Sequence, residues 1–194
     1  MTTIVLASSS PYRKNLLHRL GIEFLTDPPA IDESPRPGES GGTLVSRLSY
    51  EKAAAVAARH RDALIIASDL IGVANGKMLV KPGAIDAAVE QLASVSGRDA
   101  QFFVGLCVLD TRDGNCQTAV ERINVSFRQL SESEICDYIH REQPLDCAGS
   151  FKVEGLGIAL FQRVENRDPT ALEGLPLIRL CEFLKLVGCP VLGA

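Results

Sequence analysis

The chain has 194 residues, enough for one sizeable hydrophobic core and too few for two full domains of ordinary size. Apolar residues make up 46% of it and charged residues 23%, which is typical of a globular protein and argues against a disordered or fibrous one. The formal net charge is −4, so the chain lacks the basic excess typical of proteins that bind a nucleic-acid polymer, and we expect no such partner.

The hydrophobic pattern of the first third predicts alternating strands and helices. The expected elements are strands at residues 3–8, 22–27 and 63–69 and helices at residues 11–20 and 44–60. Ser10 and Pro11 are typical of a helix start, Gly21 is typical of a stop, and Thr43 is the expected N-cap of the second helix. Residues 28–42 are rich in Pro, Gly and charge, and a loop of this length is more often functional than a simple connector.

The remaining two thirds predict hairpins followed by helices. We expect a hairpin with its turn at Asn75-Gly76, followed by a helix at residues 85–96. Two strands follow at residues 100–110 and 116–130, joined by a turn at Asp113-Gly114. The last expected elements are a helix capped by Ser131 and Glu134, a strand at residues 157–165 and a helix at residues 175–187. Helices alternate with strands at both ends, and hairpins dominate the middle. We therefore predict an α/β fold with a mixed sheet, arranged in two lobes with a central cleft. With no repeat or linker, residues 1–194 are expected to form one domain.

Neither a membrane segment nor a histidine or cysteine site is expected. No apolar run approaches the roughly 20 residues that span a bilayer, and the first residues resemble no signal peptide. These features predict a cytoplasmic protein with no membrane partner. The six cysteines form no CxxC pair and no zinc-type cluster, so we expect buried free thiols. The three histidines have charged neighbours and are expected at the surface.

The segment "VLASSSPYRKNLL" contains the first candidate site. Ser8, Ser9 and Ser10 follow the first strand, and their hydroxyl and backbone N–H groups at a helix start can bind an anion, to which Arg13 adds a charged donor. An N-cap serine beside a solvated arginine is the alternative. This segment alone favours that alternative, because no Gly-rich phosphate motif is present.

Carboxylates and lysines elsewhere supply what a phosphate site would need. Glu33 lies in the Pro-rich loop, and Asp69 follows an apolar run, where a carboxylate at the end of a strand can act as a base or as a ligand for a hard cation. Lys81 precedes Pro-Gly, and Lys52 lies in a helix where an exposed position would be ordinary. Hydrolysis of a phosphoanhydride needs cations around the phosphates, carboxylates to hold a divalent metal and a base to activate water.

The motifs "LASSSPYRKNLL", "IDES", "EKAAAVA", "IIASD", "KPG", "CAGSFKVEG" and "NRDPTALEGLPL" resemble, in order and spacing, those of the Maf family of nucleotide pyrophosphatases. The resemblance covers essentially the whole chain. It implies a Maf/ITPase-like two-lobed fold, usually dimeric. It also implies cleavage of nucleoside triphosphates between the α- and β-phosphates, with a divalent cation (Mg²⁺ or Mn²⁺) as cofactor.

The resemblance also implies roles for individual residues. Asp69 and Lys81 are expected to be catalytic, Ser8, Arg13 and Lys52 to bind phosphate, Glu33 and Asp69 to bind the metal, and Tyr12, Leu70 and Glu154 to occupy the substrate-specificity positions.

At the positions of Tyr12 and Glu154, the sequence resembles the branch of the family that acts on 7-methyl-GTP. Methylation at N7 leaves a positive charge on the purine, on which the Tyr12 ring can stack. The Glu154 carboxylate can accept hydrogen bonds from guanine N1–H and N2–H₂. The expected reaction is therefore hydrolysis of 7-methyl-GTP to 7-methyl-GMP and pyrophosphate, a house-cleaning activity.

Two residues depart from that branch. Leu70 stands where the branch has Gln, and Val80 stands where Gly usually precedes Lys-Pro, so we expect strain if that position needs a positive φ. The alternatives are a pyrophosphatase acting on dTTP or UTP and, because of these two departures, a nucleotide-binding regulator with low turnover.

Overall fold

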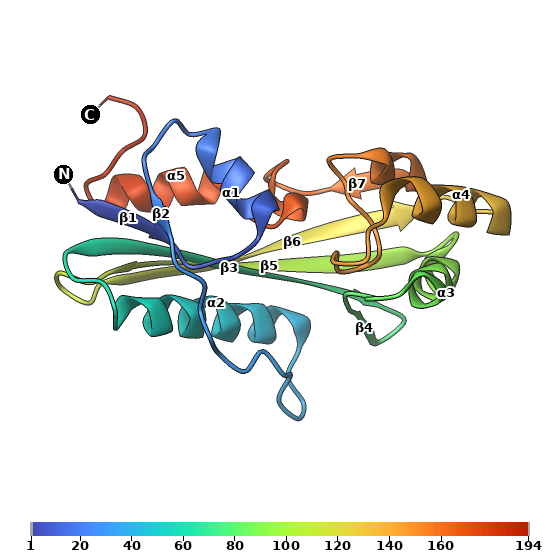
Figure 1. Ribbon diagram of the computed structural model, residues 1–194, viewed down its shortest axis with the longest axis horizontal. Helices are drawn as coiled ribbons and strands as arrows, with labels where there is room; N and C mark the ends of the chain where they lie inside the picture. Colours follow the sequence, from blue (N-terminus) through green and yellow to red (C-terminus); the bar gives the residue numbers. More distant parts are fainter. Residues whose placement is uncertain (1, 194) are drawn as a thin grey trace. The chain divides into compact units, whose positions relative to one another are not determined.

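Two apolar segments far apart in the sequence, β1 (Thr3–Leu6) and β3 (Ala63–Ala74), pair in parallel in the computed structural model, which describes residues 2–193. β1 also pairs in parallel with the short strand β2 (Leu25–Thr26), and β3 pairs antiparallel with β4 (Lys77–Leu79). The hydrogen-bonded order is β2-β1-β3-β5-β6-β7, with β4 on β3. The predicted mixed α/β fold is confirmed (Figure 1).

Two tight turns join neighbouring strands as the sequence predicts. Asn75 and Gly76, between β3 and β4, have φ values of 51° and 73°, as a type I′ turn requires. The turn containing Gly114, with φ 76°, joins β5 (Asp99–Asp110) to β6 (Cys116–Phe127). The last strand, β7 (Phe161–Glu165), pairs antiparallel with β6.

The helices follow their predicted positions, and one helix N-cap and one strand boundary differ from the prediction. The helices are α1 (Pro11–His18), α2 (Gly41–Ala57), α3 (Ile85–Val95), α4 (Glu132–Glu142) and α5 (Leu177–Leu186). Ser131 and Glu134 form the predicted capping box of α4. Ser40, not Thr43, caps α2, because its hydroxyl accepts the Thr43 N–H at 3.2 Å and the helix begins earlier. The strand expected at 157–165 begins only at Phe161, because 3₁₀ turns occupy Leu156–Leu160; a second 3₁₀ segment is Ala171–Glu173.

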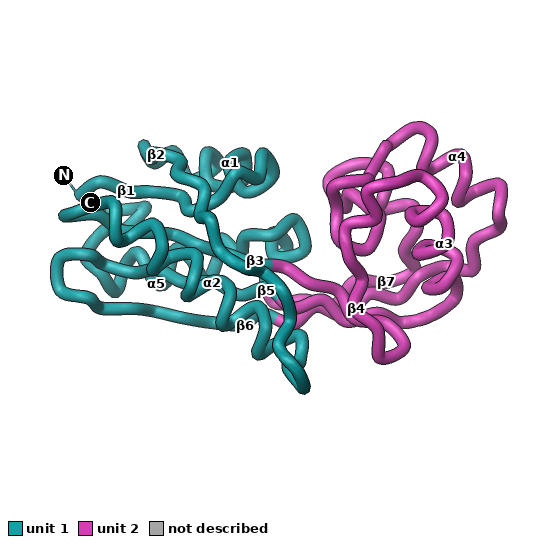
Figure 2. Tube along the Cα trace, turned by 60° about the horizontal axis from the view of Figure 1, so that its bottom comes forward, with its two compact units in different colours: residues 1–69, 104–121, 168–194 teal, residues 70–103, 122–167 magenta. Residues whose placement is uncertain are grey.

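The chain divides into two compact units, coloured separately in Figure 2. The first unit contains residues up to Asp69, residues 104–121 and residues from Asp168 onward. The second contains residues 70–103 and 122–167. Strands β3, β5 and β6 therefore contribute residues to both units.

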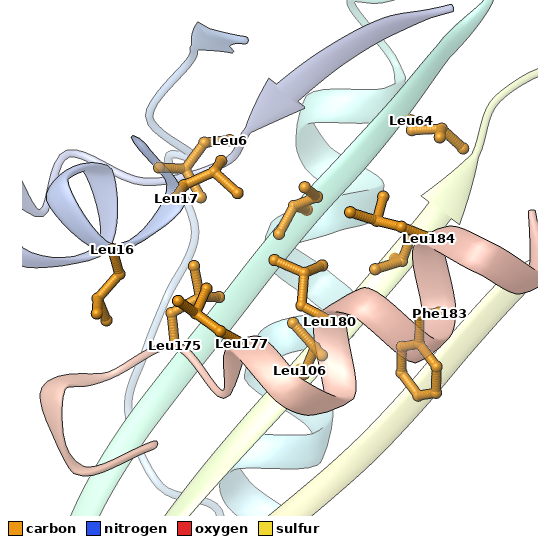
Figure 3. Packing of buried hydrophobic residues seen from close by; sticks show 12 residues of the cluster. Leu6, Leu16, Leu17, Leu64, Leu106, Leu175, Leu177, Leu180, Phe183 and Leu184 are labelled. Atoms are coloured by element: carbon orange, nitrogen blue, oxygen red, sulfur yellow. The ribbon is translucent and has the colours of Figure 1, made fainter. Parts of the chain in front are cut away.

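The core of the first unit lies on both faces of its part of the sheet. Leu64 and Ile66 of β3 point to α1 and α5, where they pack with a leucine-rich cluster (Figure 3), whereas Ala63, Ile65 and Ala67 point to α2. The two helices on one face and α2 on the other are separated by the strands (Figure 1). Because Asp69 continues this alternation, it faces α2.

A glycine allows α2 to approach the sheet closely. A Cβ atom on Gly105 of β5 would lie 2.1 Å from the backbone oxygen of Val45 and 3.0 Å from Ser49 Oγ. Since φ of Gly105 is not positive, close approach and not backbone conformation requires glycine here. The position of α2 relative to β5 therefore depends on the missing side chain.

The core of the second unit is aromatic. Phe102, Phe127, Phe151 and Phe161 pack edge to face, with ring centroids 4.9–6.0 Å apart. Phe102 lies in β5, Phe127 in β6, Phe151 in the loop that follows α4 and Phe161 at the start of β7. This cluster fixes the loop containing residues 149–151.

Two further sequence expectations concern side chains. All six cysteines are free thiols, but only Cys107 is buried and Cys136 is exposed, so their predicted burial holds for one of them. His18 and His140 are exposed and His60 is half-buried against Asp27. None of the helices formed by residues 2–193 combines the length and apolar character that crossing a bilayer requires.

Candidate active site

The first candidate segment forms both structures that the sequence left open. Ser10 is the N-cap of α1, and its hydroxyl accepts the Arg13 N–H at 3.4 Å. Ser8, which is buried, accepts the Ser10 N–H at 3.1 Å. The serines therefore cap the helix, and at the same time Ser8 shapes the turn between β1 and α1.

Arg13 turns back toward this turn instead of extending into solvent. Its NH1 group donates to Ser8 Oγ at 3.4 Å, and its Nε donates to the carbonyl of Gly174 at 3.0 Å. The same carbonyl accepts the hydroxyl of Ser68 at 2.9 Å. Burial lowers the pKa of Arg13, and the carboxylates of Asp69 and Glu33 oppose that shift. Arg13 is therefore not the solvated arginine of the alternative interpretation. It is a charged donor in the field of the Asp69 and Glu33 carboxylates.

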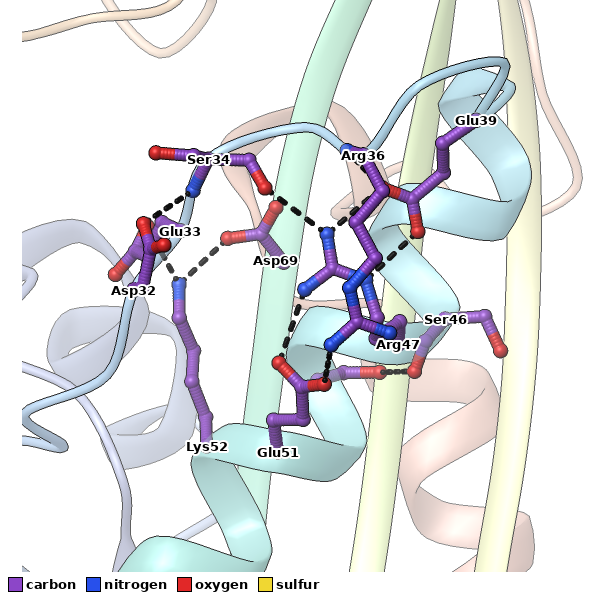
Figure 4. A network of polar contacts seen from close by, with 11 residues as sticks. Asp32, Glu33, Ser34, Arg36, Glu39, Ser46, Arg47, Glu51, Lys52 and Asp69 are labelled. Carbon is purple, nitrogen blue, oxygen red and sulfur yellow. Dashed lines mark hydrogen bonds and ion pairs between the residues drawn. The ribbon is translucent and has the colours of Figure 1, made fainter.

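Lys52 of α2 is buried and joins these two carboxylates (Figure 4). Its Nζ lies 2.6 Å from Asp69 Oδ1 and 3.0 Å from Glu33 Oε2. The exposed position that is ordinary for a helical lysine is therefore not adopted. Lys52 instead provides the ammonium of a small charge cluster.

Asp69 lies within β3, not at its end. The prediction placed it after an apolar run, but the strand continues through Leu70 to Ala74, because Ile71 and Val73 prolong the pattern that favours a strand. Asp69 is 8% exposed, and Leu70, being its neighbour on a strand, points to the opposite face. Leu70 therefore removes no polar group from the face that carries the Asp69 carboxylate.

Glu33 reaches the cluster from the Pro-rich loop. Its side chain is 56% exposed, and the preceding Asp32 accepts the Ser34 N–H at 2.9 Å, which shapes the loop locally. Hydrogen bonds from the side chain and the backbone of Ser34 lower the pKa of Asp32. Within residues 2–193 no group of three or more His, Cys, Asp or Glu side chains is arranged to hold a metal ion.

A network that the sequence analysis missed holds this loop against α2 (Figure 4). Arg47 donates to both carboxylate oxygens of Glu39 at 2.7 Å, to Glu51 at 3.0 Å and to the carbonyl of Ser34 at 3.1 Å. These bonds lower the pKa of Glu39 to about 2 and raise that of Arg47. The spacing of Arg47 and Glu51, four residues apart on one helix, was the available signal. Because Ser34 adjoins Glu33, the network fixes the backbone beside a candidate metal ligand.

The other predicted residues have different environments. Tyr12 is half-buried in the first turn of α1 in the first unit. Lys81 and Glu154 belong to the second unit, and both are exposed. The structure thus brings together Ser8, Arg13, Glu33, Lys52 and Asp69 within the first unit.

Val80 does not have the strained backbone that the sequence suggested. Its φ is not positive, whereas Gly83, three residues later, has φ 68°. The Val80 side chain is 59% exposed, so its branched Cβ meets no crowding. The glycine requirement of this turn is met at Gly83, and the expectation of strain at Val80 is wrong.

Glu154 lies in a turn that neighbouring side chains fix. The Tyr138 hydroxyl accepts the Lys152 N–H at 3.0 Å, and the Glu142 carboxylate accepts the Leu156 N–H at 2.7 Å. Burial raises the pKa of Tyr138, which keeps its hydroxyl neutral. The turn therefore presents the Glu154 carboxylate from a fixed backbone.

Comparison with known proteins identifies the family of the chain. The family model described as Maf-like protein matches residues 3–187. A relative from Nitrosococcus oceani named 7-methyl-GTP pyrophosphatase is 50% identical over 98% of this chain and 96% of its own length. Relatives with the same name from Alcanivorax borkumensis and Chromohalobacter salexigens are each 49% identical, over 96% and 100% of this chain and 94% and 100% of their own lengths.

Solved structures support the fold alone. The Ham1 protein of Staphylococcus aureus superposes with a TM-score of 0.55 at 16% identity, covering 95% of this chain and 99% of that protein. This likeness agrees with the Maf/ITPase-like fold that the sequence resemblance implies.

Proposed function

Because the chain belongs to the Maf family, we propose that it hydrolyses 7-methyl-GTP to 7-methyl-GMP and pyrophosphate. Three relatives of about half-identical sequence carry the name of that activity. The family model extends over segments of both compact units, which supports the proposal that residues 1–194 act as one domain.

The observation that carries the proposal is the charge cluster around Asp69. A carboxylate that is 8% exposed is costly unless it is paired, and here Lys52 pairs with it at 2.6 Å while Arg13 lies in its field. A core of this fold needs no such cluster for packing. Buried, paired charges of this kind are typical of functional sites.

In the proposed reaction, a water molecule attacks the α-phosphorus. A bond forms between the water oxygen and phosphorus, the bond from phosphorus to the α,β-bridging oxygen breaks, and pyrophosphate leaves. Asp69 accepts the proton that the water loses. Arg13, Lys52 and Lys81 donate to phosphate oxygens, on which negative charge develops, and Ser8 adds a hydroxyl donor.

We assign the divalent cation to Glu33 and Asp69. Both carboxylates contact the same Lys52 ammonium, at 3.0 Å and 2.6 Å, so they are close enough to share a cation. Mg²⁺ and Mn²⁺ take oxygen ligands, and Mg²⁺ is often held by one or two carboxylates together with substrate phosphates. The bound cation supplies positive charge that offsets the charge of the phosphate oxygens.

Substrate choice is assigned to Tyr12 and Glu154, as the family resemblance implies. Tyr12 stacks on the cationic 7-methylguanine ring. Glu154 accepts hydrogen bonds from N1–H and N2–H₂ of the base. Leu70 occupies the third specificity position. Because Val80 is unstrained, the low-turnover alternative loses one of its two supports.

The proposed assembly is a homodimer, and the proposed location is the cytoplasm. Both rest on the resemblance to the family. Sedimentation of the purified protein measures the first directly, and a monomer at every concentration tested would contradict it.

One assay tests the activity. Pyrophosphate release is measured from 7-methyl-GTP, GTP, UTP and dTTP, with Mg²⁺, with Mn²⁺ and with EDTA. We expect the highest kcat/KM with 7-methyl-GTP and no turnover in EDTA. A preference for UTP or dTTP would contradict the proposed substrate and favour the dTTP/UTP pyrophosphatase. Binding of 7-methyl-GTP without turnover would favour a nucleotide-binding regulator.

Asp69→Asn is the matched catalytic variant. It keeps the shape of the side chain but removes the proton acceptor, so kcat should fall by about 10²–10⁴-fold. The control is Asp99→Asn, which changes an exposed carboxylate at the start of β5 and should leave kcat unchanged. Activity of Asp69→Asn near that of the unmodified protein would remove Asp69 from its role.

A further inference from the structure

The side-chain amide of Gln91 binds both backbone polar groups of Val80, the residue immediately before Lys81. Gln91 Oε1 accepts the Val80 N–H at 3.1 Å, and its Nε2 donates to the Val80 carbonyl at 3.0 Å. β4 ends at Leu79, so Val80 has just left the hydrogen-bonding ladder of the sheet. The side-chain amide of Gln91, in α3, offers one acceptor and one donor in a fixed plane. It therefore satisfies the backbone N–H and carbonyl of Val80, as a neighbouring strand would do.

The Gln91 amide is itself fixed by a buried hydroxyl. Its Nε2 also donates to Ser150 Oγ at 2.6 Å, and Ser150 is fully buried. Ser150 adopts a left-handed backbone with φ 59°, which is uncommon for a residue other than glycine. The adjoining Phe151 belongs to the aromatic core of the second unit. The amide that holds Val80 is therefore tied to one of the most constrained parts of this unit.

A second bond fixes the other side of Lys81. Gly83 donates its N–H to the carbonyl of Leu145 at 3.0 Å, and its φ of 68° closes the turn. Pro82, between Lys81 and Gly83, has a φ that its ring restricts. The backbone before Lys81 is thus bound to Gln91 of α3 and the backbone after it to the segment between α4 and β7, while the Lys81 residue itself remains exposed.

From this geometry we propose that Gln91 is a positioning residue that holds the Lys81 turn in place for phosphate binding. The inference rests on the proposed role of Lys81 in hydrolysis. A lysine on a long flexible side chain stabilises transition-state charge only when its backbone starts from a fixed point. Gln91 supplies that fixed point at the residue before it.

Gln91→Met is the test variant, because methionine has a similar length and no hydrogen-bonding amide. A displacement of about 1 Å in a reacting group can reduce the rate about 100-fold, so kcat should fall by about 10- to 100-fold. KM should change less, since Lys81 acts mainly on charge that develops during the reaction. The matched control is Gln129→Met, which lies in the same unit and makes one bond of 3.5 Å to Ser96.

A double-mutant cycle separates positioning from general structural damage. Lys81→Ala removes the group that Gln91 positions, so adding Gln91→Met to Lys81→Ala should reduce kcat no further. A residue that merely supports the fold would reduce kcat by the same factor in both backgrounds. Equal factors, or full activity of Gln91→Met alone, would overturn the proposal.

Hydrogen exchange gives a readout that does not depend on turnover. The Val80 amide should exchange faster in Gln91→Met than in the unmodified protein or in Gln129→Met, and unchanged exchange would overturn the inference. If the unmodified protein hydrolyses none of the four nucleotides, the proposed function fails on its own. The same cycle is then measured from the affinity for 7-methyl-GTP, where additive losses in the two single variants would reject positioning.

Discussion

Replacing Lys52 by methionine should strongly destabilise the protein, because it leaves the Asp69 carboxylate without its ammonium partner. The side chains of Lys52 and Asp69 are 6% and 11% exposed and lie 2.6 Å apart. Breaking a buried pair by removing one partner typically lowers the free energy of unfolding by about 3–5 kcal/mol. Glu33, the other carboxylate on Lys52, is 56% exposed and can be hydrated by water instead. Asp69 retains the field of Arg13 as its opposite charge within residues 2–193.

Because the Arg13 charge still acts on Asp69, we expect the loss in free energy of unfolding to lie near the lower end of this range, at about 3 kcal/mol. For a chain of this size, each kcal/mol shifts Tm by about 2–4 °C, so Tm should fall by about 6–12 °C. Urea unfolding monitored by circular dichroism measures the free energy, with an unchanged m value as the check that the denatured state is the same.

Two further variants make the result decisive. The double variant Lys52→Met with Asp69→Leu removes both charges and should recover most of the lost stability. Lys14→Met changes an exposed lysine of α1 and should alter stability by less than about 0.5 kcal/mol. A loss below about 1 kcal/mol for Lys52→Met would refute the reasoning, because such a value is typical of a solvent-exposed ion pair.

Two other predictions concern α2 and the Pro-rich loop. In Gly105→Ala, the new Cβ would lie 2.1 Å from the Val45 oxygen, whereas ordinary contacts begin at 3.4 Å. Overpacking of this kind should lower the free energy of unfolding by about 1–3 kcal/mol in a thermal or urea melt, and an unchanged Tm would contradict the close approach. The pKa of Glu39 is lowered to about 2 from 4.5, so its bond to Arg47 adds stability above pH 4.5 that disappears as the pH falls toward 2. The Tm difference between the unmodified protein and Glu39→Gln should therefore shrink over that pH range, and a difference that grows toward acid pH would show that the pair is not formed.

Local features of the fold could be predicted from the sequence because they depend on neighbouring residues. The capping box of Ser131 and Glu134 and the turn at Asn75-Gly76 follow from rules that involve only a few positions. Thr43 shows the limit of such rules, because Ser40 offered an equally good cap three residues earlier. Choosing between them requires knowing where the loop before the helix is held.

The site could be predicted in its residue types more than in its arrangement. Lys52 is buried because it pairs with Asp69, which lies 17 positions further along the chain. The pattern of residues in a helix does not predict such a pairing. Gln91 was overlooked because its partners, Val80 and Ser150, are 11 and 59 positions away. Val80 was expected to be strained from sequence alone, but the conformation of its turn depends on Gly83. Contacts between distant segments decide these outcomes.

The bond from Arg13 to the carbonyl of Gly174 has a consequence for the order in which the protein is assembled during synthesis. Arg13 is made before the acceptor that holds its guanidinium, because the Gly174 carbonyl lies 161 positions later in the sequence. The leucines that cover α1 include Leu175 and Leu180, which are equally late. The guanidinium of a nascent chain can therefore be held beside Ser8 by this acceptor only after residue 174 has been made. Chains that end before residue 174 should accordingly lack the acceptor that holds the Arg13 guanidinium beside Ser8.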